Sequence, residues 1–141
     1  MRKLLILLAI PCVFTFTVPP EAVYKLLKHD LKGIGVSVPE QDIEVLAYAD
    51  MPSRVYGYSG DMGAHSNRTV CILINRNLWE EMSFKQKKLL ILHESMHSLW
   101  EYKHCTNQRC VMSTPANMSK WDSIAYDQVL IESIYHHMYS R

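Results

Sequence analysis

Three side chains within five consecutive residues could together bind a metal ion and activate water: His93, Glu94 and His97, in the pattern H-E-x-x-H. On an α-helix, side chains four residues apart leave the same face with Cβ atoms about 5 to 6 Å apart, so both imidazoles can reach one Zn²⁺. Glu94 follows the first imidazole and can reach a water on that ion, which zinc makes acidic. The pattern predicts a metal-dependent hydrolytic site with two histidine ligands and Glu94 as general base.

A catalytic zinc usually has three protein ligands, so a third donor should exist. His104 is the first candidate, but in an unbroken helix it would lie about 10 Å along the axis from His97. The helix must therefore end near residues 100–102, and the chain must turn back toward the two histidines. Carboxylates are the alternative third ligands: Glu101, Asp127 and Glu132.

The metal-binding pattern needs a helix, and the residues before it predict one. Ser83 and Gln86 have the spacing of a capping box, in which the hydroxyl and the amide bond to free backbone groups at a helix start. We expect this helix to begin at Phe84 and to carry the pattern in its C-terminal half.

Hydrophobic periodicity predicts the other elements of a single small domain. Helices are expected over 21–31 and 123–138, and strands over 43–49, 55–58 and 69–74. The first two strands could pair with each other, and a loop is expected over 59–67. This mixture of helices and strands predicts an α+β fold.

Composition and charge exclude several classes of protein. The chain has 141 residues, of which 48% are hydrophobic and 21% charged, and this ordinary globular usage excludes disorder, collagen-like repeats and a coiled coil. Its formal net charge is +1, or −1 without Arg2 and Lys3, so it has no general attraction for nucleic acid or anionic membranes. We expect neither as a partner.

The N-terminus has the pattern of a secretory signal. Arg2 and Lys3 precede an apolar stretch that runs to Val18 and is short for a membrane span. We expect residues 1–18 to be removed and residues 19–141 to form one secreted or periplasmic domain. An uncleaved membrane anchor is the alternative.

Export would place the cysteines in an oxidising compartment, which favours disulfides. The exported part contains Cys71, Cys105 and Cys110. The short spacing of the last two allows a disulfide between them, and pairing of Cys71 with one of them is the competing possibility.

The stretch from His93 to Met112 resembles the active site of metzincin metallopeptidases, whose pattern is H-E-x-x-H-x-x-G-x-x-H followed by a methionine turn. Met112 stands eight residues after His104, as in matrixin-type members. Cys105-x4-Cys110-x-Met112 also resembles the archaemetzincins.

Three features depart from these families. Trp100 stands at the glycine position of the metzincin pattern, and one extra residue separates His97 from His104, so the loop must be rebuilt. No C-x-x-C follows Met112, so we expect the second zinc site of archaemetzincins to be absent.

The resemblance implies a metzincin-like α+β fold, in which a small twisted mixed sheet packs on the active-site helix and a C-terminal helix. It implies an extended peptide substrate along an edge strand, which we assign to residues 69–74. It also implies three zinc ligands, a general base and a methionine under the metal, namely His93, His97 and His104, Glu94, and Met112.

We therefore expect a secreted zinc-dependent endopeptidase that hydrolyses peptide or protein substrates. Two other classes stay open: a secreted zinc-binding or partner-binding module without turnover, and a disulfide-stabilised structural or inhibitory protein without metal. Tyr126, His136 and His137 could donate hydrogen bonds to a transition state, but we expect each to be structural or exposed.

Overall fold

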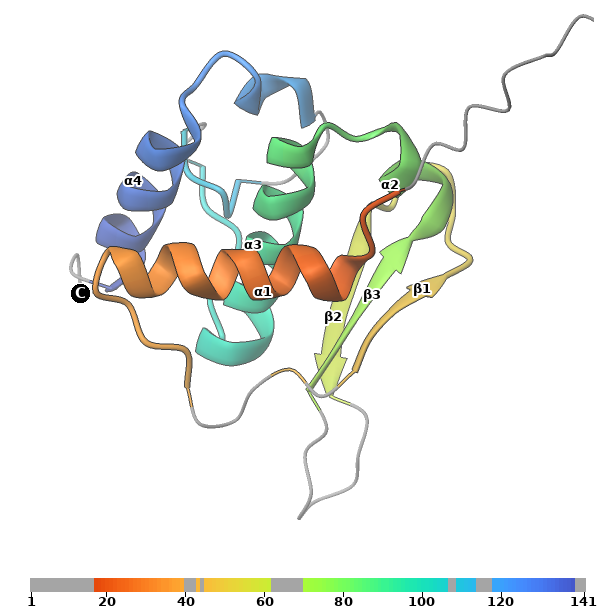
Figure 1. Cartoon of the computed structure of the whole chain (residues 1–141), viewed down its shortest axis with the longest axis horizontal. Helices are drawn as coiled ribbons and strands as arrows, with labels where there is room; N and C mark the ends of the chain where they lie inside the picture. The colour runs from red at the N-terminus through yellow and green to blue at the C-terminus, as the bar shows by residue number, and fades with distance from the viewer. Residues whose placement is uncertain are drawn as a thin grey trace, which may run out of the picture.

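The structure is a computed structural model and describes residues 17–39, 43, 45–61, 70–106, 109–113 and 118–138. Over these residues it contains one sheet and four α-helices, which confirms the α+β class. None of the helices described is long and apolar enough to cross a membrane. The predicted signal segment falls outside the described residues up to position 16. The elements in chain order (Figure 1) are α1 (Pro20–Gly33), β1 (Val45–Ala49), β2 (Gly57–Asp61), β3 (Val70–Asn75), α2 (Arg76–Glu81), α3 (Phe84–Trp100), the 3₁₀ helix η1 (Met118–Trp121) and α4 (Tyr126–Met138).

The sheet has the strand order β1-β3-β2, with β3 parallel to β1 and antiparallel to β2. Almost all side chains of the central strand β3 are buried, as its β-branched apolar run predicts. The expectation that residues 55–58 pair with residues 43–49 is wrong, because β3 lies between these segments. Residues 59–61 of the predicted loop belong to β2, and the rest of it, residues 62–67, lies outside the described residues.

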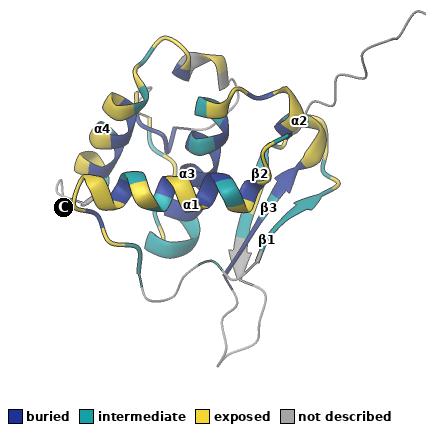
Figure 2. Cartoon of the chain, viewed as in Figure 1, coloured by how far each residue is buried: buried dark blue, intermediate teal, exposed yellow. Residues whose placement is uncertain are grey.

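Helix α3 packs against β2 and β3, and α1 packs against α3 and contacts β1, with buried residues on both helices (Figure 2). In the middle of α3, residues 89–92 are all fully buried, so this helix has apolar neighbours around its whole circumference there. Burying each large apolar side chain stabilises the fold by about 1.5 to 3 kcal/mol. The element that carries the metal-binding pattern is therefore a rigid part of the core.

Both ends of α3 lie where the sequence predicts them. At the start, the Ser83 hydroxyl accepts from the Gln86 N–H (3.2 Å), and the Gln86 side chain accepts from the Ser83 N–H (2.9 Å). At the end, Glu101 takes a left-handed conformation (φ 56°, ψ 29°), and the Tyr102 N–H donates to the Met96 carbonyl (3.1 Å). A glutamate thus makes the chain reversal at this helix end, at a backbone cost of about 1 to 2 kcal/mol.

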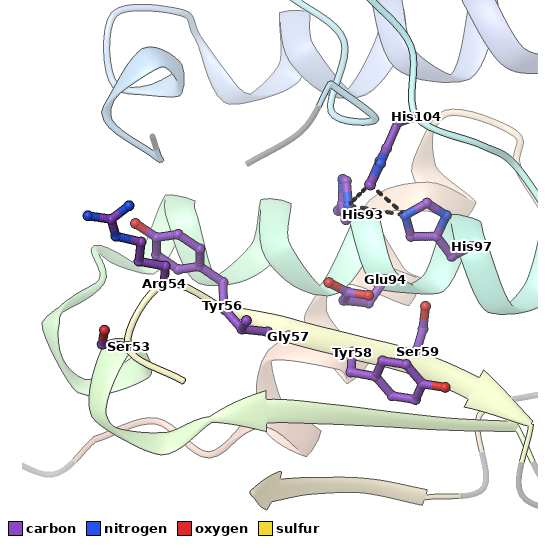
Figure 3. Close-up of a pocket in the computed structure, with 11 residues that line it drawn as sticks. Ser53, Arg54, Tyr56, Gly57, Tyr58, Ser59, His93, Glu94, His97 and His104 are labelled. Carbon is purple, nitrogen blue, oxygen red and sulfur yellow. Dashed lines mark hydrogen bonds between the residues drawn. The ribbon is translucent and has the colours of Figure 1, made fainter. Parts of the chain in front are cut away.

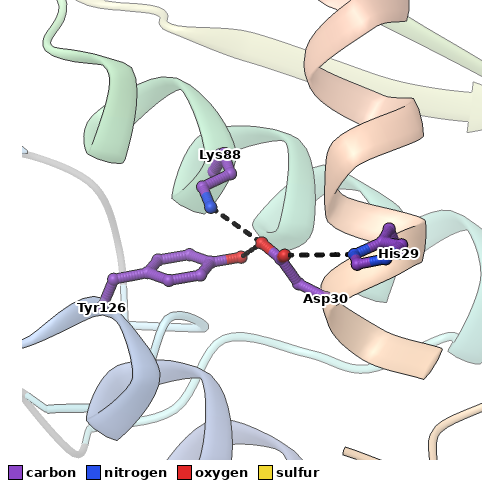
Figure 4. A network of polar contacts seen from close by, with 4 residues as sticks. All are labelled: His29, Asp30, Lys88 and Tyr126. Carbon is purple, nitrogen blue, oxygen red and sulfur yellow. Dashed lines mark hydrogen bonds and ion pairs between the residues drawn. The ribbon is translucent and has the colours of Figure 1, made fainter. Parts of the chain in front are cut away.

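A polar network joins α1, α3 and α4 (Figure 4). The Asp30 carboxylate accepts from Lys88 Nζ (2.7 Å) and from the Tyr126 hydroxyl (2.9 Å). Burial alone would raise the pKa of Asp30, but these two hydrogen bonds and the charges of Lys88 and His29 lower it overall. Tyr126 therefore has a structural role, as expected from the sequence.

Candidate metal centre

Three imidazoles meet beside the C-terminal half of α3 (Figure 3). The Nε2 atoms of His93 and His97 lie 3.2 Å apart, and the Nε2 atom of His104 lies 3.1 Å from that of His97 and 3.2 Å from that of His93. Nitrogens bound tetrahedrally to zinc at about 2.0 to 2.1 Å lie about 3.3 Å apart. The structure thus brings all three predicted ligand residues together in an arrangement that fits one zinc ion.

Backbone carbonyls fix the orientation of the two helical imidazoles. His93 Nδ1 lies 2.7 Å from the Val111 carbonyl oxygen, and His97 Nδ1 lies 2.6 Å from the Tyr102 carbonyl oxygen. Because a carbonyl only accepts, each Nδ1 carries the hydrogen, and the Nε2 lone pairs of the neutral rings point into the triangle. Burial lowers the pKa of His97, and the nearby His104 lowers it further against the opposing effect of the Tyr102 carbonyl.

The segment after His104 supplies the support beneath His93. Met112 is fully buried in a turn that also holds Val111, whose carbonyl receives the His93 hydrogen bond. The turn is tied to α4, because the Ser133 hydroxyl accepts from the Val111 N–H (2.9 Å). It is tied to residues 101–106, the return segment that follows α3, by a bond from the Cys105 N–H to the Met112 carbonyl (3.1 Å).

Glu94 is a buried carboxylate at the edge of the metal-binding triangle. Its side chain is 5% exposed, and burial raises its pKa to about 7, against the opposing effect of a hydrogen bond from Ser59. Gly57 on β2 packs directly on it, since a Cβ atom there would lie 2.9 Å from Glu94 Oε1. The carboxyl group is therefore held between α3 and β2 and changes its protonation state near neutral pH.

A cavity of about 900 Å³ lies along these groups, between β2 and α3 (Figure 3). Residues 53–59 form one wall, and the three histidines and Glu94 form the other. The assignment of residues 69–74 as the edge strand beside the site is wrong. Strand β3 has both sides occupied, and β2 is the edge strand that borders the cavity.

Asn75 binds the backbone of the segment that forms one wall of this cavity, and the sequence did not predict this role. It is 2% exposed, and its side-chain amide donates to the carbonyls of Pro52 (3.2 Å) and Val55 (2.7 Å), while its N–H donates to the Tyr56 carbonyl (2.9 Å). In the sequence it marks only the end of an apolar strand, so no local pattern predicts this bond across the chain.

The alternative third ligands do not join the three histidines in the described part of the chain. Glu101 is the exposed residue at the end of α3, and Glu132 pairs with Arg109 (3.5 Å) and Gln128 (2.9 Å). Asp127 lies in the first turn of α4 and belongs to neither group of donors that could hold a metal ion.

A second group of donors contains Cys105 and Cys110, whose short spacing allows a disulfide. No disulfide joins the described cysteines, so neither the Cys105–Cys110 bond nor the competing bond to Cys71 is formed in the structure. The two sulfurs and one ring nitrogen of His137 instead lie within 4.8 Å of one another. Spacing alone could not reveal this group, because His137 comes from α4.

Comparisons with known proteins assign no family to the chain. No protein-family model matches it, and no match is found among curated proteins or solved structures. Its function has to be argued from the chemistry of the site itself.

Proposed function

We propose that the protein is a zinc-dependent endopeptidase whose metal is held by His93, His97 and His104. The observation that carries the proposal is the triangle of Nε2 atoms 3.1 to 3.2 Å apart beside a buried carboxyl group. Three histidines with an open fourth position are a catalytic rather than a structural zinc set. A bound zinc ion would act as a Lewis acid and would lower the pKa of a water molecule in the open position.

Glu94 is the general base of this proposal. A carboxyl group with a pKa of about 7 accepts and releases protons readily at neutral pH, which suits it to both halves of the reaction. It removes a proton from the water that attacks the scissile carbonyl carbon. It then delivers this proton to the amide nitrogen, which leaves as an amine when the C–N bond breaks.

The polypeptide substrate lies in the cavity along β2. As an edge strand of the described sheet, β2 offers backbone donors and acceptors to an extended peptide, which would add main-chain hydrogen bonds. The cavity wall formed by residues 53–59 includes the aromatic side chains of Tyr56 and Tyr58, which can cover apolar substrate groups. The cavity volume of about 900 Å³ accommodates several residues of a peptide.

We further propose that the protein is a divergent metzincin exported from the cell. The proposal is supported by the motif, by the return of His104 to the site and by the buried Met112 in the turn after it. The departures from the family pattern are absorbed by Glu101, which replaces the glycine turn with a left-handed glutamate.

The substitution Glu94→Gln tests the catalytic role. We expect it to keep zinc bound while lowering the rate of cleavage of a peptide library by about 10² to 10⁴, because general-base catalysis contributes that much. Zinc content is measured by mass spectrometry of the metal and cleavage by mass spectrometry of the peptides. Glu80→Gln, an exposed change on α2, is the matched control and should cleave like the wild type.

Two results would overturn the proposal. Cleavage that is unchanged in Glu94→Gln would remove the general base from the mechanism. A zinc-loaded wild type that cleaves no peptide in a broad library would favour the alternative function, a zinc-binding or partner-binding module without turnover.

A further inference from the structure

Three metal-binding side chains outside the proposed active site converge on one point. Cys105 lies on the return segment after α3, Cys110 lies in the turn that holds Met112, and His137 lies near the end of α4. Their two sulfurs and a ring nitrogen lie within 4.8 Å of one another, and Cys110 Sγ is 3.1 Å from His137 Nε2. We propose that these three residues form a second metal site, for zinc or a similar soft divalent ion, which fixes the segment that carries His104.

The donor chemistry selects the metal. Two thiolates and an imidazole are soft and borderline ligands, which bind zinc in preference to calcium or magnesium. Two sulfurs bound tetrahedrally to zinc at about 2.3 Å lie about 3.8 Å apart. Small side-chain movements would therefore bring the three donor atoms to the separations of a zinc site. The Met112 N–H already points at Cys110 Sγ (3.4 Å), as backbone donors do around metal-bound thiolates.

The surroundings hold the donors in place and leave one position open. Cys110 is buried at 1% exposure, while the His137 ring stacks on Tyr102 at a centroid distance of 4.8 Å. A cavity of about 370 Å³ borders Cys105 and His137 and also reaches His104. With three protein ligands, the fourth coordination position is left for a solvent molecule from this cavity.

The position of the cluster gives it a role in the main site. Residues 101–106 form neither helix nor strand, yet His104 must keep its Nε2 atom within 3.2 Å of two other nitrogens. Cys105 is the next residue along the chain, and Tyr102, which stacks on His137, supplies the carbonyl for His97. A metal bound to Cys105 and His137 therefore anchors the return segment to α4. This positioning role rests on the proposed three-histidine site, whereas the second site does not.

Cobalt substitution of the full chain distinguishes the two sites. We expect two metal ions per chain and a sulfur-to-cobalt charge-transfer band in the near ultraviolet, which imidazole ligands alone do not give. Cys105→Ser and His137→Gln should each reduce the content to one ion and abolish the band. His136→Asn is the matched control, because this exposed neighbour is outside the group of donors, and it should keep both ions.

Zinc competition against a chelator tests the positioning role. In Cys105→Ser, we expect the affinity of the remaining site to fall by about 10-fold to 100-fold, as it does when support around a metal site is lost. An unchanged affinity would overturn the positioning role and leave the second site in place. His97→Asn should bind one ion and keep the charge-transfer band, so that loss of the three-histidine site is recognised separately.

The wild type alone can overturn the second site, whatever the variants do. A chain that binds one cobalt ion without a charge-transfer band excludes it. The same conclusion follows if mass spectrometry of the metal-treated chain finds Cys105 and Cys110 joined by a disulfide. A band with one ion per chain would instead support the second site and overturn the proposed active site.

Discussion

Two polar regions lie six residues apart on α3 and are built in opposite ways. Lys88 belongs to a network in which every named charge has a partner: its ammonium group contacts Asp30 at 2.7 Å, and Tyr126 donates to the same carboxylate. At Glu94 the carboxyl group is buried against Gly57, and three ring nitrogens crowd together beside it. The pKa of Asp30 is lowered, whereas that of Glu94 is raised to about 7.

Under the proposed function, this difference separates polar groups that stabilise the fold from polar groups that bind a ligand. In the Asp30 network, the protein supplies both signs of charge, so the charged state is favourable without any other molecule. At the three histidines, the described residues supply nitrogen lone pairs that point at one another and a buried carboxyl group. A bound cation would reduce both the repulsion between the lone pairs and the cost of burying a carboxylate charge. The two regions should therefore respond differently to zinc, to pH and to single substitutions.

The largest expected effect is that of zinc on stability. In the proposed function zinc binds the folded chain, so at a free concentration a thousand times its dissociation constant one site would add about 4 kcal/mol to the free energy of unfolding. His97→Asn should lose this increment, measured by urea unfolding with zinc and with chelator. Asp30→Asn should keep it. If zinc raised the free energy of unfolding equally in wild type and His97→Asn, the three histidines would not be the region that responds to zinc.

The next effect is a pH dependence in the metal-free protein. The folded pKa of Glu94 is about 7, above its ordinary value of 4.5, so the folded state holds the proton more tightly than the unfolded state. The free energy of unfolding therefore falls as the pH rises from 4.5 to about 7. The shift corresponds to about 3 kcal/mol in total. Relative to wild type, Glu94→Gln should become increasingly more stable between about pH 5 and about pH 8 in urea unfolding with chelator.

A comparison of the two proteins removes the titration of the histidines, which they share. Glu80→Gln is the control and should follow the wild type at each pH. A stability difference between Glu94→Gln and wild type that does not change with pH would show that the carboxyl group is not held neutral by burial.

A smaller loss is expected in the paired region. Asp30→Asn removes the ion pair with Lys88 and weakens the bond from Tyr126, and because both partners are partly buried we expect a loss of about 1 to 3 kcal/mol. The loss should be the same with zinc and with chelator, and it should be measured by urea unfolding. Asp50→Asn, an exposed change, should alter stability by less than about 0.5 kcal/mol. If the stability loss in Asp30→Asn differed with zinc and with chelator, the Asp30 network would not be independent of the three histidines.

The smallest effect on stability should come with a clear effect on catalysis. In Gly57→Ala, the new methyl group would lie 2.9 Å from Glu94 Oε1, so the carboxyl group must move. We expect cleavage to slow by about 10-fold to 100-fold, while the free energy of unfolding changes by less than about 1 kcal/mol. Gly33→Ala, where nothing lies within 4 Å of the new atom, is the matched control. Unchanged cleavage in Gly57→Ala would mean that β2 does not position Glu94.

The parts that the sequence predicts are the local ones. The Ser83–Gln86 capping box, the helix it starts and the spacing of His93 and His97 all depend on residues within one turn or two. The return of His104 could be predicted because the third ligand forces the helix to end.

The parts that the sequence does not predict depend on contacts between distant segments. The strand order placed β3 between β1 and β2, so the edge strand at the cavity is β2. The Asn75 bonds to the cavity wall and the approach of His137 to Cys110 join residues that no spacing rule relates. Tertiary packing decides these contacts, and local patterns carry no record of them.

Anomalous diffraction at the zinc absorption edge, from crystals of the zinc-loaded full chain, tests the central claim most directly. We predict an anomalous peak about 2.0 to 2.1 Å from the Nε2 atoms of His93, His97 and His104. Zinc-loaded crystals with no peak among these three imidazoles, or with a carboxylate in the place of His104, would contradict it.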